Sequence, residues 1–385
     1  MNEDMKKHII KVVFILVAIT IVLALIIRAC SKKDNDKPHP AHNQVSTITP
    51  TQPPVSYTTP TLPDVIYVTQ DPAADLPETS DIPEIPADTD EQITYPQDNP
   101  QEEPLSYPTV TPEETIPYTG SSDFRVTFID VGQGDCALIE DNGSAMLIDA
   151  GPKESVATIE AVLDQYQIKT IDTMVLTHND ADHIQGASNI IEDYGVGCIY
   201  MSDYAKETGS YYYLTKYISK YNVPVYYPKA GSSIPFGTAT YEVVGPLQGA
   251  AYEDINSYSI IVRVRHGNDS FLFTGDATGE ETDDILRAGI DVNAQIIKAA
   301  HHGSANQGCN NKAFWDAVNP EAVVISCARY NDHGHPHKEV MEMTQQRGCK
   351  LFRTDLQGTI SCISTGNGVQ WNMAPSDNYL NGNSL

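Results

Sequence analysis

The chain has 385 residues, with 51 acidic against 24 basic side chains, so its formal net charge is −27 at pH 7. Proteins that coat nucleic acids without sequence preference neutralise phosphates with a surplus of lysine and arginine, and this chain has the opposite balance. The length allows two or three segments, but only one large core if part of the chain is non-globular. The acidic residues and the 25 prolines are unevenly distributed along the chain, which indicates segments of different character.

Residues 1–33 are predicted to be an N-terminal membrane anchor. The 19 residues 9–27 read IIKVVFILVAITIVLALII, with Lys11 as their one charge. A helix of this length spans roughly 28 Å, close to the hydrocarbon thickness of a bilayer. Three basic residues lie at each end of the span, counting Lys11 with Lys6 and Lys7 at the first end and Arg28, Lys32 and Lys33 at the second, so the positive-inside rule leaves its orientation open. The alternative is a cleaved signal peptide with a lipidated Cys30, because Ile27 to Cys30 loosely resembles a lipobox.

Residues 34–122 hold 17 of the 25 prolines, 16 acidic residues and one lysine, Lys37, and they contain neither Phe nor Trp. A segment of this composition cannot bury enough apolar surface to offset its chain entropy. It is therefore predicted to be a disordered, extended stalk. Stalks of this type commonly hold a domain away from a membrane, which favours an extracellular position for the C-terminal part.

Residues 123–373 alternate apolar runs with amphipathic stretches and short turns, which indicates an α/β domain. Strands are expected in FRVTFIDV, AMLIDA, TIDTMVLT, CIYMS, VPVYY, YEVVG, SIIVRVR, SFLFTGD, AQIIKAA, AVVIS and LFRTD. Helices are expected in SVATIEAVLDQY, ASNIIEDYG, TGEETDDILRAG, KAFWDAVN and from Pro336 to about Arg347. Residues 374–385 are expected to be a flexible tail. The seven cysteines show no metal-ligand spacing, and Cys309 and Cys349 are the candidates for a disulfide.

The strongest chemical signal is the segment Thr177-His178-Asn179-Asp180-Ala181-Asp182-His183, directly after an apolar run. It places two imidazoles and two carboxylates within six residues. Burying these groups without partners would be costly, so a divalent metal is the natural compensation. The alternative interpretation of the same residues is a solvated polar loop.

This segment resembles the second motif of the metallo-β-lactamase fold, H-x-H-x-D-H, with Asp180 in place of the middle histidine. The variant and its surroundings are similar to the extracellular hydrolase domain of ComEC-type competence proteins, over about residues 124–371. The many transmembrane helices of the competence protein's DNA channel are not part of the likeness. The other matching patches are Phe128 to Asp135, Leu147 to Gly151, Asn256 to Ile260, Phe273 to Asp276, His301 to Ser304, Gly334 to Pro336 and Arg353 to Asp355.

The resemblance implies a four-layer αββα sandwich with two divalent ions at one edge. The implied ligands are His178 and Asp180 for metal 1, Asp182, His183 and His302 for metal 2, and Asp276 as the bridge between the two ions. Asp149 would support the metal loop, the segment from Thr177 to His183. The last histidine ligand of the fold is typically followed by glycine, which favours His302 over His301 and leaves His301 to face the substrate. The reverse order stays open.

The fold usually supplies one more histidine between the second motif and the bridging aspartate. His266 is the one histidine in that interval, and it is expected in a hairpin turn too far from Asp276 to bind a metal there. Three carboxylates among six ligands make the site harder than an all-histidine zinc site. Zinc is the expected metal, with manganese as the alternative.

Asn331 to His337 contribute a further group of candidates in a loop after the run AVVIS. His335 is expected near the metals, either as a proton donor or as a supplementary ligand, whereas the alternative is a helix-entry loop with solvated histidines. The candidate catalytic residues are therefore Asp182, His301 and His335, and the candidate substrate contacts are Asn256, Ser304 and Asn331.

The expected function is that of a membrane-tethered extracellular phosphodiesterase or nuclease with a two-metal-activated water. The resemblance implies this substrate, because the related domain is implicated in degrading one DNA strand during uptake. A strip of Lys298, Arg329, Lys338 and Arg353 is a candidate contact surface for DNA. The alternatives are a cell-wall or teichoic-acid phosphodiester esterase and a non-catalytic surface binding module. No feature of the sequence predicts a stable protein partner.

Overall fold

A computed structural model describes residues 124–204 and 207–384. The predicted anchor and stalk, residues 1–122, lie outside this range. Within the described residues, no helix is both long enough and apolar enough to cross a membrane.

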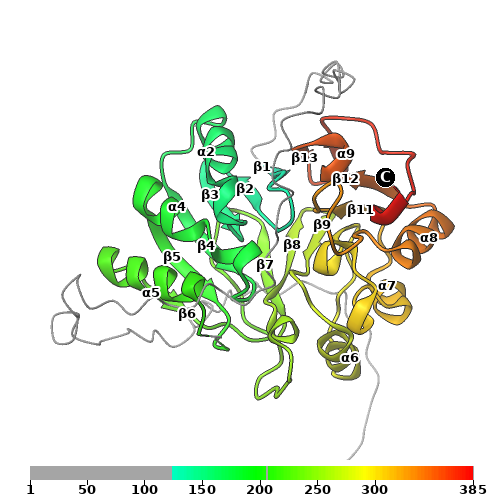
Figure 1. Ribbon diagram of the computed structural model, residues 1–385, viewed down its shortest axis with the longest axis horizontal. Helices are drawn as coiled ribbons and strands as arrows, with labels where there is room; N and C mark the ends of the chain where they lie inside the picture. The colour runs from blue at the N-terminus through cyan, green and yellow to red at the C-terminus, as the bar shows by residue number, and fades with distance from the viewer. Residues whose placement is uncertain (1–123, 205–206, 385) are drawn as a thin grey trace, which may run out of the picture. The chain divides into compact units, whose positions relative to one another are not determined.

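Two β-sheets form the centre of the fold (Figure 1). The eight-stranded sheet has the order β14-β13-β1-β2-β3-β4-β5-β6, and the six-stranded sheet has the order β12-β11-β10-β9-β8-β7. The strands of the first sheet are β1 (Phe124–Phe128), β2 (Ala137–Asp141), β3 (Ser144–Ile148), β4 (Ile171–Leu176), β5 (Val196–Met201), β6 (Val225–Tyr226), β13 (Ile360–Ser364) and β14 (Val369–Trp371). Those of the second are β7 (Thr240–Gly245), β8 (Ile261–His266), β9 (Asp269–Phe273), β10 (Ile296–Lys298), β11 (Ala322–Ile325) and β12 (Lys350–Arg353).

Helices cover the outer face of each sheet. The α-helices are α2 (Val156–Gln165), α3 (Ala181–Ile184), α4 (Ala187–Tyr194), α5 (Gly209–Tyr221), α6 (Gly279–Arg287), α7 (Lys312–Val318), α8 (Lys338–Arg347) and α9 (Thr354–Gln357). The 3-10 helices are η1 (Lys153–Ser155), η2 (Ile255–Tyr258), η3 (Ala300–Gly303), η4 (Asn306–Gly308) and η5 (Gly382–Ser384). In Figure 1, α2, α4 and α5 lie beside the first sheet, and α6, α7 and α8 beside the second.

Three apolar clusters hold these layers together. One cluster joins the facing sides of the two sheets, where the rings of Phe128 and Phe273 lie 5.9 Å apart. A second cluster packs the first sheet against its helices, and a third does the same for the second sheet. Strand residues alternate between the two faces of a sheet, so each buried strand supplies both the central cluster and an outer one. The structure thus confirms an α/β fold of two sheets and flanking helices.

Several elements had no counterpart among the expected ones, and α5 is the longest of them. Its tyrosine-rich sequence GSYYYLTKYISKY carries residue types that favour strands. Its helical signal is limited to Leu214 and Ile218, four residues apart and both buried. Thr208 caps the first turn by accepting a hydrogen bond from the Tyr211 backbone N–H, and Asn222 ends the helix in a left-handed conformation. Burial of one face, rather than residue propensity, therefore decides this element.

Residues 374–384, in the segment predicted to be a flexible tail, make specific contacts with the domain. The fully buried Arg353 guanidinium donates to the carbonyl oxygens of Asn378, at 3.3 Å, and Leu380, at 2.5 Å. The Gly382 N–H donates to the Pro336 carbonyl at 3.0 Å. These contacts satisfy a buried cation that would otherwise be costly.

The cysteines in the described part of the chain are all free, so Cys309 and Cys349 do not form a disulfide. The Cys349 thiol donates to the Pro320 carbonyl oxygen at 3.1 Å, and both cysteines are buried.

Candidate metal centre

The candidate ligands follow strands whose carboxyl ends lie at one edge of the fold. β3 and β4 run parallel in the first sheet, and β9, β10 and β11 run parallel in the second. Loops after parallel neighbours emerge at the same edge, so segments far apart in sequence meet there. Asp149 follows β3, His178 to His183 follow β4, Asp276 follows β9, and His301 and His302 follow β10.

Four donor side chains converge at this edge, with one ligand atom of each lying within 4.8 Å of the others: Asp182, His183, Asp276 and His302. His302 Nε2 lies 3.0 Å from Asp182 Oδ2 and 3.4 Å from Asp276 Oδ2. His183 Nε2 lies 3.3 Å from Asp276 Oδ2. The same four residues are those that the resemblance implies for metal 2.

The predicted metal 1 residues are less tightly grouped. His178 Nε2 lies 3.8 Å from Asp180 Oδ2, and the His178 ring lies 4.2 Å from that of His183. Among residues 124–204 and 207–384, no third donor forms a comparably compact group with His178 and Asp180. His301 Nε2 is 3.7 Å from Asp276 Oδ2, but its side chain is 24% exposed, against 1% for His302. This difference supports His302 as the ligand and an outward-facing His301.

The three buried histidines share one orientation. His183 Nδ1 contacts Asp149 Oδ2 at 2.8 Å, and His302 Nδ1 contacts the Ser326 carbonyl at 3.0 Å. His178 Nδ1 lies 3.1 Å from the Thr177 hydroxyl, which itself donates to Asp149 Oδ2 and therefore accepts from the imidazole. Each Nδ1–H is thus directed to an acceptor outside the centre, which leaves each Nε2 as the atom that can bind a metal. Asp149 supports the metal loop, as the resemblance implies.

The charges at the centre fit a divalent cation. Burial lowers the pKa of His183, but the nearby carboxylates, first that of Asp276, raise this pKa well above its ordinary value. Burial raises the pKa of Asp276, but the surrounding imidazoles, first that of His302, hold it well below its usual range. Within the described residues, His178 Nε2, His183 Nε2 and Asp276 Oδ1 are buried with no hydrogen-bond partner. A bound metal ion would neutralise these buried carboxylates, which otherwise draw protons onto the histidines. It would also give a partner to the buried nitrogen and oxygen atoms that lack one.

Asp135 and Lys298 also support this centre, although neither was among the site residues predicted from the sequence. The Lys298 ammonium forms a buried ion pair with Asp135, whose other oxygen lies 3.4 Å from His302 Nδ1. The predicted basic strip is therefore wrong, because Lys298 is buried in this pair and Arg353 is buried against Asp355 at 2.6 Å. The one signal for Asp135 was its place after Gly134 in the matching turn.

Two further histidines considered from the sequence, His335 and His266, do not belong to the group of four donors. His335 is buried, and its ring lies 5.5 Å from that of His301 and 6.0 Å from that of His302. Burial, together with the positive charge of nearby imidazoles, lowers the pKa of His335 to about 2. His266 stacks on Phe124 at 4.6 Å and contacts the Ser364 hydroxyl at 2.7 Å, so its neighbours belong to the strands and not to the donor group.

Of the three candidate substrate contacts, Asn256 and Ser304 are buried and Asn331 is half-buried. The Asn331 amide donates to the Ala328 and His335 carbonyls and accepts from the His335 N–H, so it fixes the loop. The Ser304 hydroxyl accepts from the Asn306 N–H. In the described part of the molecule, Asn256 Oδ1 has no hydrogen-bond partner. Asn331 and Ser304 thus serve the backbone of their own loops.

Residues 129–307 match the model of the metallo-beta-lactamase superfamily. The chain is 25% identical over 258 residues to ComE operon protein 3 of Bacillus subtilis, which covers 62% of this chain and 33% of that protein. It is 26% identical over 253 residues to competence protein ComA of Neisseria gonorrhoeae, covering 64% and 33%. It is 28% identical over 243 residues to recombination protein 2 of Haemophilus influenzae, covering 62% and 28%. The chain spans about a third of the length of these relatives.

Two solved structures align with this chain at low similarity. The diiron β-hydroxylase CmlA from Streptomyces venezuelae is 15% identical with a TM-score of 0.43, covering 64% of this chain and 55% of that one. The metallo-beta-lactamase fold protein YhfI from Bacillus subtilis is 13% identical with a TM-score of 0.39, covering 57% and 93%. On the family model and the curated relatives, the chain carries a domain of the metallo-beta-lactamase superfamily that is homologous to part of the ComEC-type competence proteins.

Proposed function

We propose that this chain is a membrane-tethered, metal-dependent phosphodiesterase whose catalytic domain lies outside the cell. The observation that carries the proposal is the convergence of Asp182, His183, Asp276 and His302 within 4.8 Å, at the edge where the parallel strands end. Homology to competence proteins, which handle DNA, supports a phosphodiester substrate and a nuclease activity.

The residues of the centre have separable roles. Asp276 Oδ2 lies within 3.7 Å of Nε2 of three histidines, so its carboxylate would hold metal at the centre of the group. Divalent ions bound here would activate water and polarise the scissile bond, and zinc and manganese both suit this mixed donor set. Asp149 and Ser326 keep the ligand histidines oriented by accepting their Nδ1–H bonds. His301, partly exposed beside Asp276, is placed to contact the substrate.

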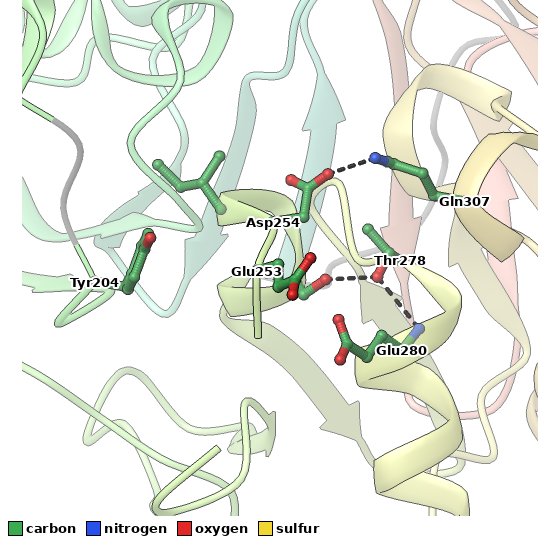
Figure 2. Close-up of a pocket in the computed structure, with 8 residues that line it drawn as sticks. Tyr204, Glu253, Asp254, Thr278, Glu280 and Gln307 are labelled. Carbon is green, nitrogen blue, oxygen red and sulfur yellow. Dashed lines mark hydrogen bonds between the residues drawn. The ribbon is translucent and has the colours of Figure 1, made fainter. Parts of the chain in front are cut away.

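A pocket of about 600 Å³ is formed in part by residues that neighbour the candidate ligands along the chain (Figure 2). It is lined by Tyr204, Glu253, Asp254, Ile255, Ser257, Thr278, Glu280 and Gln307. Thr278 lies two residues after Asp276, and the Asn179 side chain of the metal loop donates to the Tyr204 carbonyl at 2.6 Å. The pocket therefore shares its walls with the segments that carry the ligands.

The lining of this pocket favours a second candidate substrate. Figure 2 shows Tyr204 on one side, and Glu253, Asp254 and Glu280 on the other. Three carboxylates disfavour the bare phosphate backbone of DNA and favour a polymer that carries ammonium groups or hydroxyls. A decorated teichoic acid, in which cationic substituents alternate with phosphodiesters, has this chemistry.

Hydrolysis assays on the full-length chain test both candidates. After loading with Zn²⁺ or with Mn²⁺, the chain is incubated with single-stranded DNA, double-stranded DNA, a D-alanylated glycerol-phosphate polymer and a β-lactam. We expect phosphodiester cleavage that disappears on chelation and returns with added metal. The Asp276→Ala variant, purified in the same way, corrects for contaminating nucleases. If the unmodified chain and Asp276→Ala were equally active on every substrate, the proposed enzymatic activity would be refuted. The alternative of a non-catalytic binding module would then remain.

The proposed location is tested on intact cells. Protease added outside should release a fragment that contains residues 124–384, cut within the predicted stalk at residues 34–122. Complete protection of this fragment, with cleavage only after lysis, would contradict the extracellular placement. Release without any protease would instead indicate a signal peptide that is cleaved without lipidation of Cys30.

A further inference from the structure

The Nδ1 atom of His335 accepts a hydrogen bond, whereas the Nδ1 atoms of the ligand histidines donate one. The Ala328 N–H donates to Gln133 Oε1 at 3.3 Å. A backbone N–H can only donate, so this contact fixes which end of the Gln133 amide is oxygen. Gln133 Nε2, which can only donate, then lies 3.3 Å from His335 Nδ1. His335 Nδ1 must therefore accept, and it carries no proton.

We propose that Gln133 holds His335 as a neutral imidazole protonated at Nε2, and that His335 serves as a hydrogen-bond donor to an anionic oxygen of the substrate. Gln133 is then a positioning residue. The tautomer follows from the hydrogen bonds alone, whereas the contact with substrate rests on the proposed function.

This arrangement excludes both roles that the sequence left open for His335. A histidine that binds metal through Nε2 keeps its proton on Nδ1, as His183 and His302 do, and that proton would point at the Gln133 amide hydrogens. A histidine that acts as a general acid begins as an imidazolium, which has the same proton on Nδ1. A neutral imidazole can still stabilise a developing negative charge by donating from Nε2, without transferring its proton.

The loop around His335 is built to keep this geometry. Asn331 bonds both the N–H and the carbonyl of His335, at 2.9 and 2.7 Å. Both ring nitrogens of His337, two residues later, have hydrogen-bond partners. Its Nδ1 accepts from the Ala305 N–H, and its Nε2 therefore donates to the His333 carbonyl. The Nε2–H of His337 is thus used by the loop backbone, whereas the Nε2–H of His335 is not.

Nuclear magnetic resonance on the full-length, metal-free chain with ¹⁵N-labelled histidine tests the tautomer directly. His335, assigned from its missing signals in His335→Gln, should show an unprotonated Nδ1 and a protonated Nε2. In Gln133→Glu the carboxylate can only accept, so a proton should appear on His335 Nδ1. An Nδ1-protonated His335 in the unmodified chain, or an unchanged tautomer in Gln133→Glu, would overturn the proposal.

Gln357→Glu is the matched control. Gln357 also accepts from a backbone N–H, that of Arg353 at 2.9 Å, and it donates to the Ala374 carbonyl and not to a histidine. This variant should leave the His335 tautomer unchanged. A change of the His335 tautomer in this variant would show that the effect is not specific to Gln133, and would count against the proposal.

Kinetics with metal bound test the role toward substrate. His335→Ala should lower kcat by about 10²- to 10³-fold, as expected for one lost donor to a developing oxyanion, with metal content unchanged. His335→Gln, whose amide N–H can reach a similar position, should recover part of this loss. A loss confined to substrates with poor leaving groups would identify a general acid, and a loss of metal would identify a ligand; either result overturns the donor role. If the unmodified chain hydrolyses no phosphodiester, the proposed function fails, while the tautomer remains tested by resonance.

Discussion

At the residue scale, the centre depends on carboxylates that several histidines share. Asp276 is 2% exposed, its Oδ2 faces three imidazoles, and its Oδ1 has no hydrogen-bond partner among the described residues. The metal loop supplies two of the four donors, Asp182 and His183. The other two, Asp276 and His302, come from loops of the second sheet. Asp182, by comparison, lies within 4 Å of two of these imidazoles, those of His183 and His302.

Asp276→Ala should therefore weaken metal binding by more than about 100-fold, since even partners outside the ligand shell contribute 10- to 100-fold. Turnover should be lost with the metal. Metal content by elemental analysis, measured beside initial rates, checks this. His266→Ala is the control, because His266 contacts Phe124 and Ser364 and not the centre, and it should keep both quantities. A normal metal content in Asp276→Ala would rule out Asp276 as a ligand.

At the scale of elements, the metal loop is held by the turn between β1 and β2. The Asp135 N–H donates to the Asp182 carbonyl at 3.2 Å, and a Cβ at Gly134 would clash with that same carbonyl. The φ angle of Gly134 is +142°, which also disfavours other residues. This close approach fixes where α3 begins, and with it the positions of Asp182 and His183.

Gly134→Ala should displace α3 and weaken metal binding at least 10-fold, because groups that orient metal ligands contribute 10- to 100-fold to metal affinity. Isothermal titration with Zn²⁺ measures this. Gly143→Ala is the matched control, because Gly143 also has a positive φ, +86°, while no described heavy atom lies within 4 Å of its Cβ position. Both variants should lose some stability, but Gly143→Ala should bind Zn²⁺ normally. Equal affinities in the two variants would mean that the contact between Gly134 and Asp182 does not position the ligands.

At the scale of the whole molecule, one buried carboxyl group, that of Glu281, makes stability depend on pH. Glu281 of α6 is fully buried, and neither of its carboxylate oxygens has a hydrogen-bond partner in the described residues. Burial raises its pKa well above the ordinary value, more than the charge of Lys229 lowers it. The unfolded chain releases this proton at a lower pH than the folded one, so Glu281 lowers stability progressively as pH rises above about 4.5 toward the folded pKa.

Glu281→Gln should therefore raise the free energy of unfolding at neutral pH, by about 1–3 kcal/mol, and have little effect near pH 4. Urea unfolding of the full-length chain across this pH range measures the difference. Glu280→Gln, at the exposed neighbouring position, should show no such pH-dependent gain. A Glu281→Gln variant that is equally stabilised, or destabilised, at all pH values would show that Glu281 is ionised in the folded chain.

The sequence by itself predicted the α/β class, the superfamily and the four donors that converge, because these depend on local patterns. Strand periodicity, and polar residues directly after apolar strands, are visible over a few residues and place those residues at a sheet edge. The same local information missed α5, whose helical character depends on burying Leu214 and Ile218 against other elements.

Only the tertiary structure decided the partners of groups that are distant in sequence. Lys298 and Arg353 looked like surface cations, but Asp135 and Asp355 neutralise them inside the fold. The nitrogen that each histidine leaves free depends on acceptors and donors from other loops, namely Asp149, Ser326 and Gln133. A side chain's charge and hydrogen-bonding capacity are properties of the residue, whereas its burial and its partner are properties of the packed chain.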